Sequence, residues 1–218
     1  MKKIKYFLLL ICSFALVGCF ESKSIEYWID NPTATEIKIA IDGKKLAIPA
    51  KSGANYKFES GKHNLSYNND TVNFNIEPIK SFAIINPTLS NYVIYKIEYK
   101  KDSLLGAISD TIKSGSGKKD DINYTTQAII DGELQEIEAP FMPVNSLFIN
   151  KDEYKWDYFL DEPIPDSVKL KKFKSKAVKT KIFSEDDFFK HMQDAGLKTK
   201  ISFLANTKKL SDYSDSEN

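Results

Sequence analysis

The chain has 218 residues, with 31 basic and 30 acidic side chains and a formal net charge of +1 at neutral pH. Every basic residue is a lysine, so the planar guanidinium fork that grips phosphates and guanine edges is absent. With near-neutral charge and no basic stripe, the composition argues against a nucleic-acid partner. The length suits one large domain or two small ones, with enough chain to bury a core.

The first 19 residues have the pattern of an export signal. Lysines within the first five residues precede an apolar run from Tyr6 to Val17, and the small residue Gly18 stands before Cys19. The apolar run is about 12 residues long, whereas a helix that crosses a bilayer needs about 20. We therefore expect a cleaved signal, and the alternative is a signal-anchor helix that happens to contain Cys19.

The box Leu16-Val17-Gly18-Cys19 resembles the lipidation box of bacterial lipoproteins. This resemblance implies that residues 1–18 are removed as a signal peptide, that diacylglycerol is attached to the sulfur of Cys19, and that the new amino terminus is acylated, for example with palmitate. Two or three acyl chains hold a protein durably on a membrane. Residues 19–24 would then form a short lipidated tether.

The resemblance also bears on location. Phe20 is not the aspartate that retains many such lipoproteins at the inner membrane. In a bacterium with two membranes, the resemblance therefore favours the outer membrane, facing the periplasm; a bacterium with one membrane is the alternative. Cys12 leaves with the signal and Cys19 is acylated, so the mature chain has no thiol for a disulfide or a cysteine-ligated metal.

Residues 25–78 alternate apolar and polar side chains, which predicts an antiparallel β-module. The alternating residues include Ile37, Ile39 and Ile41. The turn signals between the strands are Asn31-Pro32-Thr33, Asp42-Gly43, Ser60-Gly61-Lys62 and Asn68-Asn69-Asp70. Five or six short strands in this span suggest a small sandwich or partial barrel.

Three pieces of this module are similar to PEGA-type surface β-modules: Ile39 to Gly43, Ile48-Pro49-Ala50, and Gly61 to Leu65. Those modules carry an Ile-Asp-Gly hairpin, a proline step and a Gly-x-His-x-Leu strand. The likeness implies a β fold for an extracellular adaptor and carries no catalytic residue over to this chain.

Residues 79–205 predict a second β-rich part. Strands are expected over 82–87, 92–99, 146–149 and 201–204, with an Asp131-Gly132 hairpin joining 128–130 to 134–137, and a second hairpin pairing 168–173 with 177–183. A short helix over 102–112 and a polar loop over 113–121 are expected between them. The best helix signal covers residues 185–195, with Ser184 as its N-cap and Gly196 after its end. Residues 206–218 predict a disordered tail.

The expected fold class is therefore mainly β (α+β): antiparallel β-sandwich-like modules with a C-terminal α-helix. One acidic and aromatic stretch stands out as a candidate partner-binding or glycan-binding patch, with a solvated loop whose aromatic rings pack inward as the structural alternative. Its candidate residues are Tyr154, Trp156, Asp157, Tyr158, Asp161 and Glu162.

The two histidines, His63 and His191, lack the spacing of a metal site or a catalytic pair, and no serine-nucleophile or cofactor motif is found. We therefore expect no enzyme activity, no metal and no cofactor. The favoured function is a lipid-anchored envelope lipoprotein that binds another envelope protein, as an assembly accessory or an immunity-type factor. An envelope glycan or peptidoglycan hydrolase, or a ligand-binding lipoprotein of a transport system, is the alternative.

Overall fold

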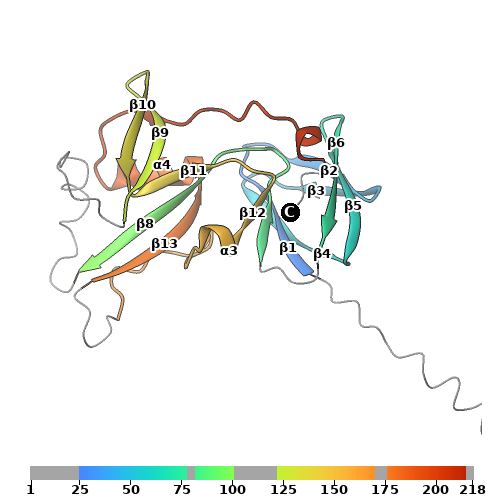
Figure 1. The fold of residues 1–218 in the computed structure, drawn as a ribbon, viewed down its shortest axis with the longest axis horizontal. Coiled ribbons are helices and arrows are strands. Elements are labelled where there is room, and N and C mark those ends of the chain that lie inside the picture. The colour runs from blue at the N-terminus through green and yellow to red at the C-terminus, as the bar shows by residue number, and fades with distance from the viewer. Residues whose placement is uncertain (1–24, 78–81, 101–121, 170–175, 215–218) are drawn as a thin grey trace, which may run out of the picture.

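The computed structural model describes residues 25–77, 82–100, 122–169 and 176–214, and over these residues the protein is mainly β (Figure 1). The strands form four sheets, with orders β12-β7-β1-β4, β3-β2-β5-β6, β11-β8-β13 and β10-β9-β14. The elements are β1 Ile25–Asn31, β2 Ile37–Ile41, β3 Lys44–Ile48, β4 Ser52–Phe58, β5 Gly61–Tyr67, β6 Asp70–Ile76, β7 Ala83–Ile85, β8 Tyr92–Lys100, β9 Tyr124–Ile130, β10 Glu133–Ala139, β11 Phe141–Val144, β12 Phe148–Asn150, α3 Lys151–Tyr154, β13 Lys176–Ser184, α4 Glu185–Asp194, β14 Ile201–Ser202 and η1 Leu210–Tyr213.

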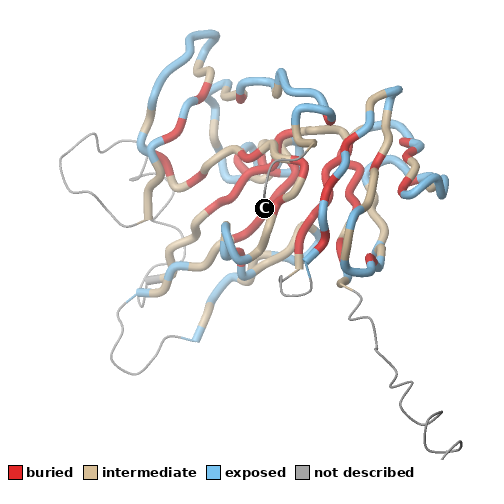
Figure 2. Tube along the Cα trace, turned by 45° about the vertical axis from the view of Figure 1, so that its right-hand side comes forward, coloured by how far each residue is buried: buried red, intermediate tan, exposed pale blue. Residues whose placement is uncertain are grey.

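The first two sheets face each other as a sandwich. Alternate residues of β2 and β6 are buried, including Ile41 and Val72, and they share one core with Ile29 of β1 and Phe58 of β4. The period-2 pattern therefore places one face of each strand inward, as the sequence predicts. Figure 2 shows buried residues running along the packed strands.

Two strands from beyond residue 78 complete this sandwich. β7 pairs parallel with β1, with Ile29 opposite Ile85, and β12 pairs antiparallel with β7. Parallel neighbours need a long crossover connection, and here the chain between β1 and β7 forms the remaining strands of the sandwich. The sandwich is thus assembled from distant parts of the chain.

The second part contains the other two sheets and α4. β8 lies between β11 and β13, and the β9–β10 hairpin is joined by β14. Phe188 and Met192 on α4 pack against Phe141 and Phe183 of these sheets. The predicted Asp131-Gly132 hairpin and the predicted C-terminal helix, with Ser184 as its N-cap, are both present.

The predicted pairing of 177–183 with 168–173 is not seen in the described residues. β13 pairs along its whole length with β8, from Lys176 opposite Lys100 to Ser184 opposite Tyr92. β8 offers an apolar partner of equal length, whereas Val168 and Lys169 lie in no strand. Three predicted regions lie outside the described residues: residues 170–173, the helix over 102–112 and the loop over 113–121.

The predicted disordered tail over 206–218 is wrong for the residues that the structure describes. The chain after β14 crosses back to the first sandwich (red in Figure 1), and η1 lies against β6. Leu210 is buried in the sandwich core, and Asp70 accepts hydrogen bonds from the backbone N–H and hydroxyl of Ser211. Contacts of this apolar side chain and of Ser211 thus hold a largely polar segment against the sandwich; we call residues 203–214 the C-terminal strap.

Candidate functional site

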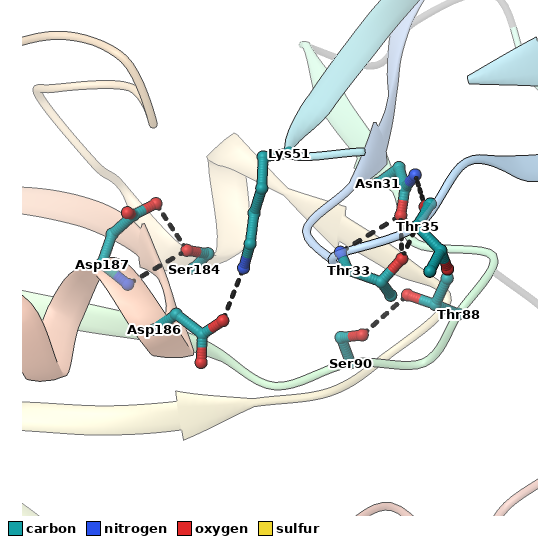
Figure 3. Close-up of polar contacts among 9 residues, drawn as sticks. All are labelled: Asn31, Thr33, Thr35, Lys51, Thr88, Ser90, Ser184, Asp186 and Asp187. Atoms are coloured by element: carbon teal, nitrogen blue, oxygen red, sulfur yellow. Dashed lines mark hydrogen bonds and ion pairs between the residues drawn. The ribbon is translucent and has the colours of Figure 1, made fainter. Parts of the chain in front are cut away.

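Polar side chains gather where the two parts of the molecule meet, at the ends of β1 and β7, the β3–β4 turn and the start of α4 (Figure 3). We call this region the polar junction. Its residues are Asp30, Asn31, Thr33, Lys51, Asn86, Thr88, Ser90, Tyr92, Ser184, Asp186 and Asp187.

Two matching Asn-Pro-Thr turns form one side of the polar junction. The fully buried Asn31 side chain donates to Thr35 O at 2.8 Å and accepts from the Thr33 hydroxyl at 2.6 Å. Asn86 repeats this arrangement with Ser90 O at 2.8 Å and the Thr88 hydroxyl at 3.1 Å. Because β1 and β7 are parallel neighbours, both turns follow the C-terminal ends of their strands at the same end of the sheet.

Each asparagine also holds a second loop. Asn31 donates to Ile48 O and Pro49 O, and Asn86 donates to Ser146 O. The repeated Asn-Pro-Thr triplet at residues 31–33 and 86–88 is the signal that could have identified this pair from the sequence. The local turn signal of each triplet does not predict that the two turns lie together.

The start of α4 forms the other side of the polar junction. Ser184 caps the helix: its hydroxyl accepts from the Asp187 backbone N–H at 3.3 Å and donates to the Asp187 carboxylate at 2.6 Å. Lys51, whose backbone N–H donates to Thr33 O, reaches across to Asp186 with an Nζ–Oδ2 distance of 2.5 Å. Both partners of this ion pair are solvent-exposed, so it contributes little to stability.

A buried carboxylate lies behind this surface. Asp30 Oδ1 accepts from the Trp28 indole at 2.8 Å, and Asp30 Oδ2 accepts from the Tyr92 hydroxyl at 2.6 Å. Burial raises the pKa of Asp30, and the hydrogen bonds from Tyr92 and Trp28 oppose that rise. Burial also raises the pKa of Tyr92 well above its usual value, with the negative charge of Asp30 adding to the effect.

The Trp28 ring, which donates a hydrogen bond to Asp30, lies directly over Gly53. Gly53 is the residue opposite Asp30 on β4. A Cβ added at Gly53 would stand 2.3 to 2.5 Å from three indole atoms of Trp28. Glycine is therefore required at this strand position because the ring occupies the space of a side chain. Phe159 also makes an edge-on contact with the indole, at 5.9 Å between ring centroids.

These contacts make the polar junction a joint between the two parts of the molecule. The hydroxyls of Thr33, Thr88 and Ser184 each bond to a neighbouring side chain, and no histidine lies among the residues of the junction. In the described part of the chain, no group of three or more His, Cys, Asp or Glu side chains is arranged to hold a metal ion. The geometry supports a positioning role for these residues.

The predicted acidic and aromatic patch is anchored to β13. Trp156 is buried, and Tyr158 makes an isolated parallel bridge with Lys181. Asp157 accepts from Lys179 Nζ at 2.5 Å and from the Thr180 backbone N–H at 2.9 Å. In this segment the indole of Trp156 is therefore buried, and the carboxylate of Asp157 is bound by β13.

The remaining patch residues also divide into a partly buried aromatic side chain and exposed carboxylates. Tyr154 is half-buried, and burial together with Glu153 raises its pKa to about 12. Glu162 is exposed and accepts a hydrogen bond from the Phe159 backbone N–H, while Asp161 is exposed beside it. This arrangement resembles the structural alternative for the stretch, a solvated loop with inward-facing rings.

Lys181 is the residue that fastens this segment, and sequence reasoning missed it. Its side chain is only 4% exposed, yet Nζ donates to Phe159 O at 2.5 Å, Leu160 O at 3.1 Å and Glu162 O at 2.6 Å. Burial lowers the pKa of Lys181, and the charge of Glu162 opposes that shift. A lysine in a lysine-rich strand gives no local sign of such a role.

The two histidines lie in different parts of the molecule. His63 Nδ1 is 2.7 Å from Asp42 Oδ2 and Nε2 is 2.8 Å from Glu59 O, so both ring nitrogens face acceptors. Burial alone would raise the pKa of Asp42, but the hydrogen bonds from His63 and the Asn64 N–H lower it. His191 stacks on Phe183 at 5.3 Å, and burial lowers its pKa.

Cys19 and the rest of the predicted lipidation box lie outside the described residues. Among the helices that are described, none has the length and apolar character to cross a bilayer. Comparison of the chain with protein-family models, with curated proteins and with solved structures gives no match.

Proposed function

We propose that this protein is a lipid-anchored lipoprotein of a bacterial envelope that binds another envelope protein. The observation that carries the proposal is the order of lysines, apolar run and Leu16-Val17-Gly18-Cys19 at the start of the chain. β1 begins at Ile25, only a few residues after Cys19. An anchor at Cys19 would therefore hold the folded body close to its membrane.

The fold supports binding more than chemistry. The conspicuous polar side chains of the polar junction are used in contacts within the chain, as described above. The acidic patch is likewise engaged by β13, with Asp157 bound to Lys179 and Thr180. A rigid β body with polar side chains committed to its own structure suits a protein that presents a surface to a partner.

The anchor would also orient the body. β1 runs from Ile25, at the end near Cys19, to Asn31 at the polar junction. At about 3.3 Å per strand residue, these two ends are about 20 Å apart. The polar junction would thus lie on the side of the sandwich away from the membrane.

The anchor is tested by intact-mass measurement and membrane fractionation of the chain expressed from its full sequence. We expect the wild-type protein to start at Cys19, to carry the added mass of acyl chains and to sediment with membranes. Cys19→Ala should yield unprocessed precursor or soluble protein, whereas the matched control Cys12→Ala should behave as wild type. An unmodified chain starting at Met1 would exclude the proposal.

The binding role is tested by detergent solubilisation of membranes followed by affinity purification and mass spectrometry. We expect the wild-type chain to retain one envelope protein reproducibly, in amounts comparable to its own. Turnover of a cell-wall glycan by the purified chain would instead favour the hydrolase alternative.

A further inference from the structure

The outer edge of β10 is open in the described structure. β10 pairs with β9 alone, at the end of the sheet order β10-β9-β14. The hairpin stands at the outer side of the second part (Figure 1). Leu134 on this strand is 55% exposed, the largest exposed fraction among the large apolar side chains that the structure describes.

The register identifies which backbone groups point outward. Asp131 and Gly132 form a two-residue turn with positive φ angles, so Ile130 and Glu133 form the first hydrogen-bonded pair. Alternate residues of β10 then direct their N–H and C=O groups away from β9. Those residues are Leu134, Glu136 and Glu138, and none of their backbone groups bonds to another described residue outside the hairpin.

Three other edge strands of the described structure, β13, β6 and β3, are protected in ways that β10 is not. The edge of β13 is covered by the acidic segment, since Thr180 O accepts from the backbone N–H groups of Asp157 and Tyr158. The edge of β6 is covered by the C-terminal strap, where Ser214 Oγ accepts from the Asn73 N–H.

The edge of β3 is blunted by composition. It carries the exposed lysines Lys44 and Lys45 and ends next to Pro49, and both residue types discourage strand addition. β10 has neither lysine nor proline along its seven residues. Its backbone can therefore accept a further strand without steric obstruction from its own sequence.

The negative charge on β10 indicates which side chains an added strand would carry. Glu136 and Glu138 project from the same face as Leu134, because side chains two residues apart share a face. Two copies of β10 paired with each other would bring these carboxylates together, which is unfavourable. An added strand with alternating lysines would instead place positive charge opposite them.

We propose that β10 is a docking strand that binds an extended, lysine-bearing segment of a partner protein by strand addition. Backbone hydrogen bonds at residues 134, 136 and 138 would supply affinity, and Glu136 and Glu138 would supply the preference for lysine. The inference rests on the proposed function, because it names the surface by which the lipoprotein binds its partner.

The test uses the full chain, purified in detergent, and two labelled peptides of alternating residues, one of lysine and valine and one of glutamate and valine. Binding is measured by fluorescence anisotropy and by changes in the amide signals of β10. We expect the lysine peptide to bind at least tenfold more tightly than the glutamate peptide. Its affinity should fall with added salt, and the amide changes should centre on residues 134–138.

Glu136→Pro removes one outward N–H and leaves the β9 pairing intact, so it should weaken binding at least tenfold. Ala47→Pro, at the equivalent outward position of β3, is the matched control and should bind as wild type. The double change Glu136→Lys and Glu138→Lys keeps every backbone group and should invert the preference between the two peptides, which tests the proposal even if the proline variant unfolds.

Three outcomes would overturn the proposal: equal binding of both peptides, undiminished binding of the lysine peptide by a folded Glu136→Pro variant, or self-association of the chain that Glu136→Pro abolishes. These failures are distinct from failure of the proposed function. A membrane-anchored Glu136→Pro chain that still retains its envelope partner would leave the proposed function standing and exclude β10 as the docking strand.

Discussion

Replacement of Gly53 by alanine tests the central packing contact of the polar junction. The added methyl group would lie 2.3 Å from Cε2, 2.4 Å from Nε1 and 2.5 Å from Cζ2 of Trp28. Ordinary van der Waals contact begins near 3.4 Å, so the indole must move by about 1 Å. That movement would lengthen the 2.8 Å hydrogen bond from Trp28 Nε1 to Asp30.

The expected cost has two parts. Overpacking of a well-filled site typically costs about 1–3 kcal/mol, and a hydrogen bond to a charged group contributes about 1.5–3 kcal/mol. Alanine recovers about 0.5–1 kcal/mol over glycine within a strand. Since overlapping effects are not additive, we expect Gly53→Ala to lower the free energy of unfolding by about 2–4 kcal/mol.

Urea unfolding followed by circular dichroism measures this loss, and a double-mutant cycle with Trp28→Ala isolates its cause. Trp28→Ala removes the three atoms nearest to the added methyl group, so Gly53→Ala should be neutral or slightly stabilising in the Trp28→Ala background. If Gly53→Ala costs the same in both backgrounds, steric conflict with Trp28 is not the reason for glycine at this position.

Two further predictions concern buried charge. Because the folded state raises the pKa of Asp30, the folded protein binds this proton more tightly than the unfolded chain, and the stability contributed by Asp30 falls as pH rises from the ordinary aspartate range through the raised pKa. Asp30→Asn should therefore gain stability relative to wild type across that window in urea unfolding at stepped pH, and a pH-independent difference would contradict the assignment. Lys181→Met leaves three carbonyls without their donor, which should cost about 1–3 kcal/mol and increase proteolysis within residues 156–162. Lys179→Met, which breaks only a partly exposed ion pair with Asp157, should cost less than about 1 kcal/mol; equal losses would show that the buried lysine has no special role.

The mainly β fold and its hairpins were predictable because their signals are local. Asp42, Asn68 and Asp131 adopt positive φ angles in tight turns, which is the conformation that these residue types tolerate best. The start of α4 was predictable for the same reason, since Ser184 and the acidic first turn are adjacent in the sequence.

Pairing between distant strands was not predictable in this way. Periodicity says which side chains face inward, but it does not say which strand lies next to which. The lysine-rich sequence over 168–183 looked like a hairpin, yet β13 pairs with β8, some eighty residues earlier. The same limit hid Lys181, whose three carbonyl partners come from a loop that the sheet brings alongside.

The C-terminal strap and the polar junction together explain why the two parts hold as one body. The core of the first sandwich contains Ala83 and Ile85 from β7, Leu147 from the loop before β12 and Leu210 from the strap. A chain that ended at residue 78 would leave the β7 side of β1 without its parallel neighbour and would expose the apolar surface that these side chains cover. The division near residue 78 therefore separates two patterns in the sequence but not two independent folding units. Residues after 78 complete the core of the first sandwich.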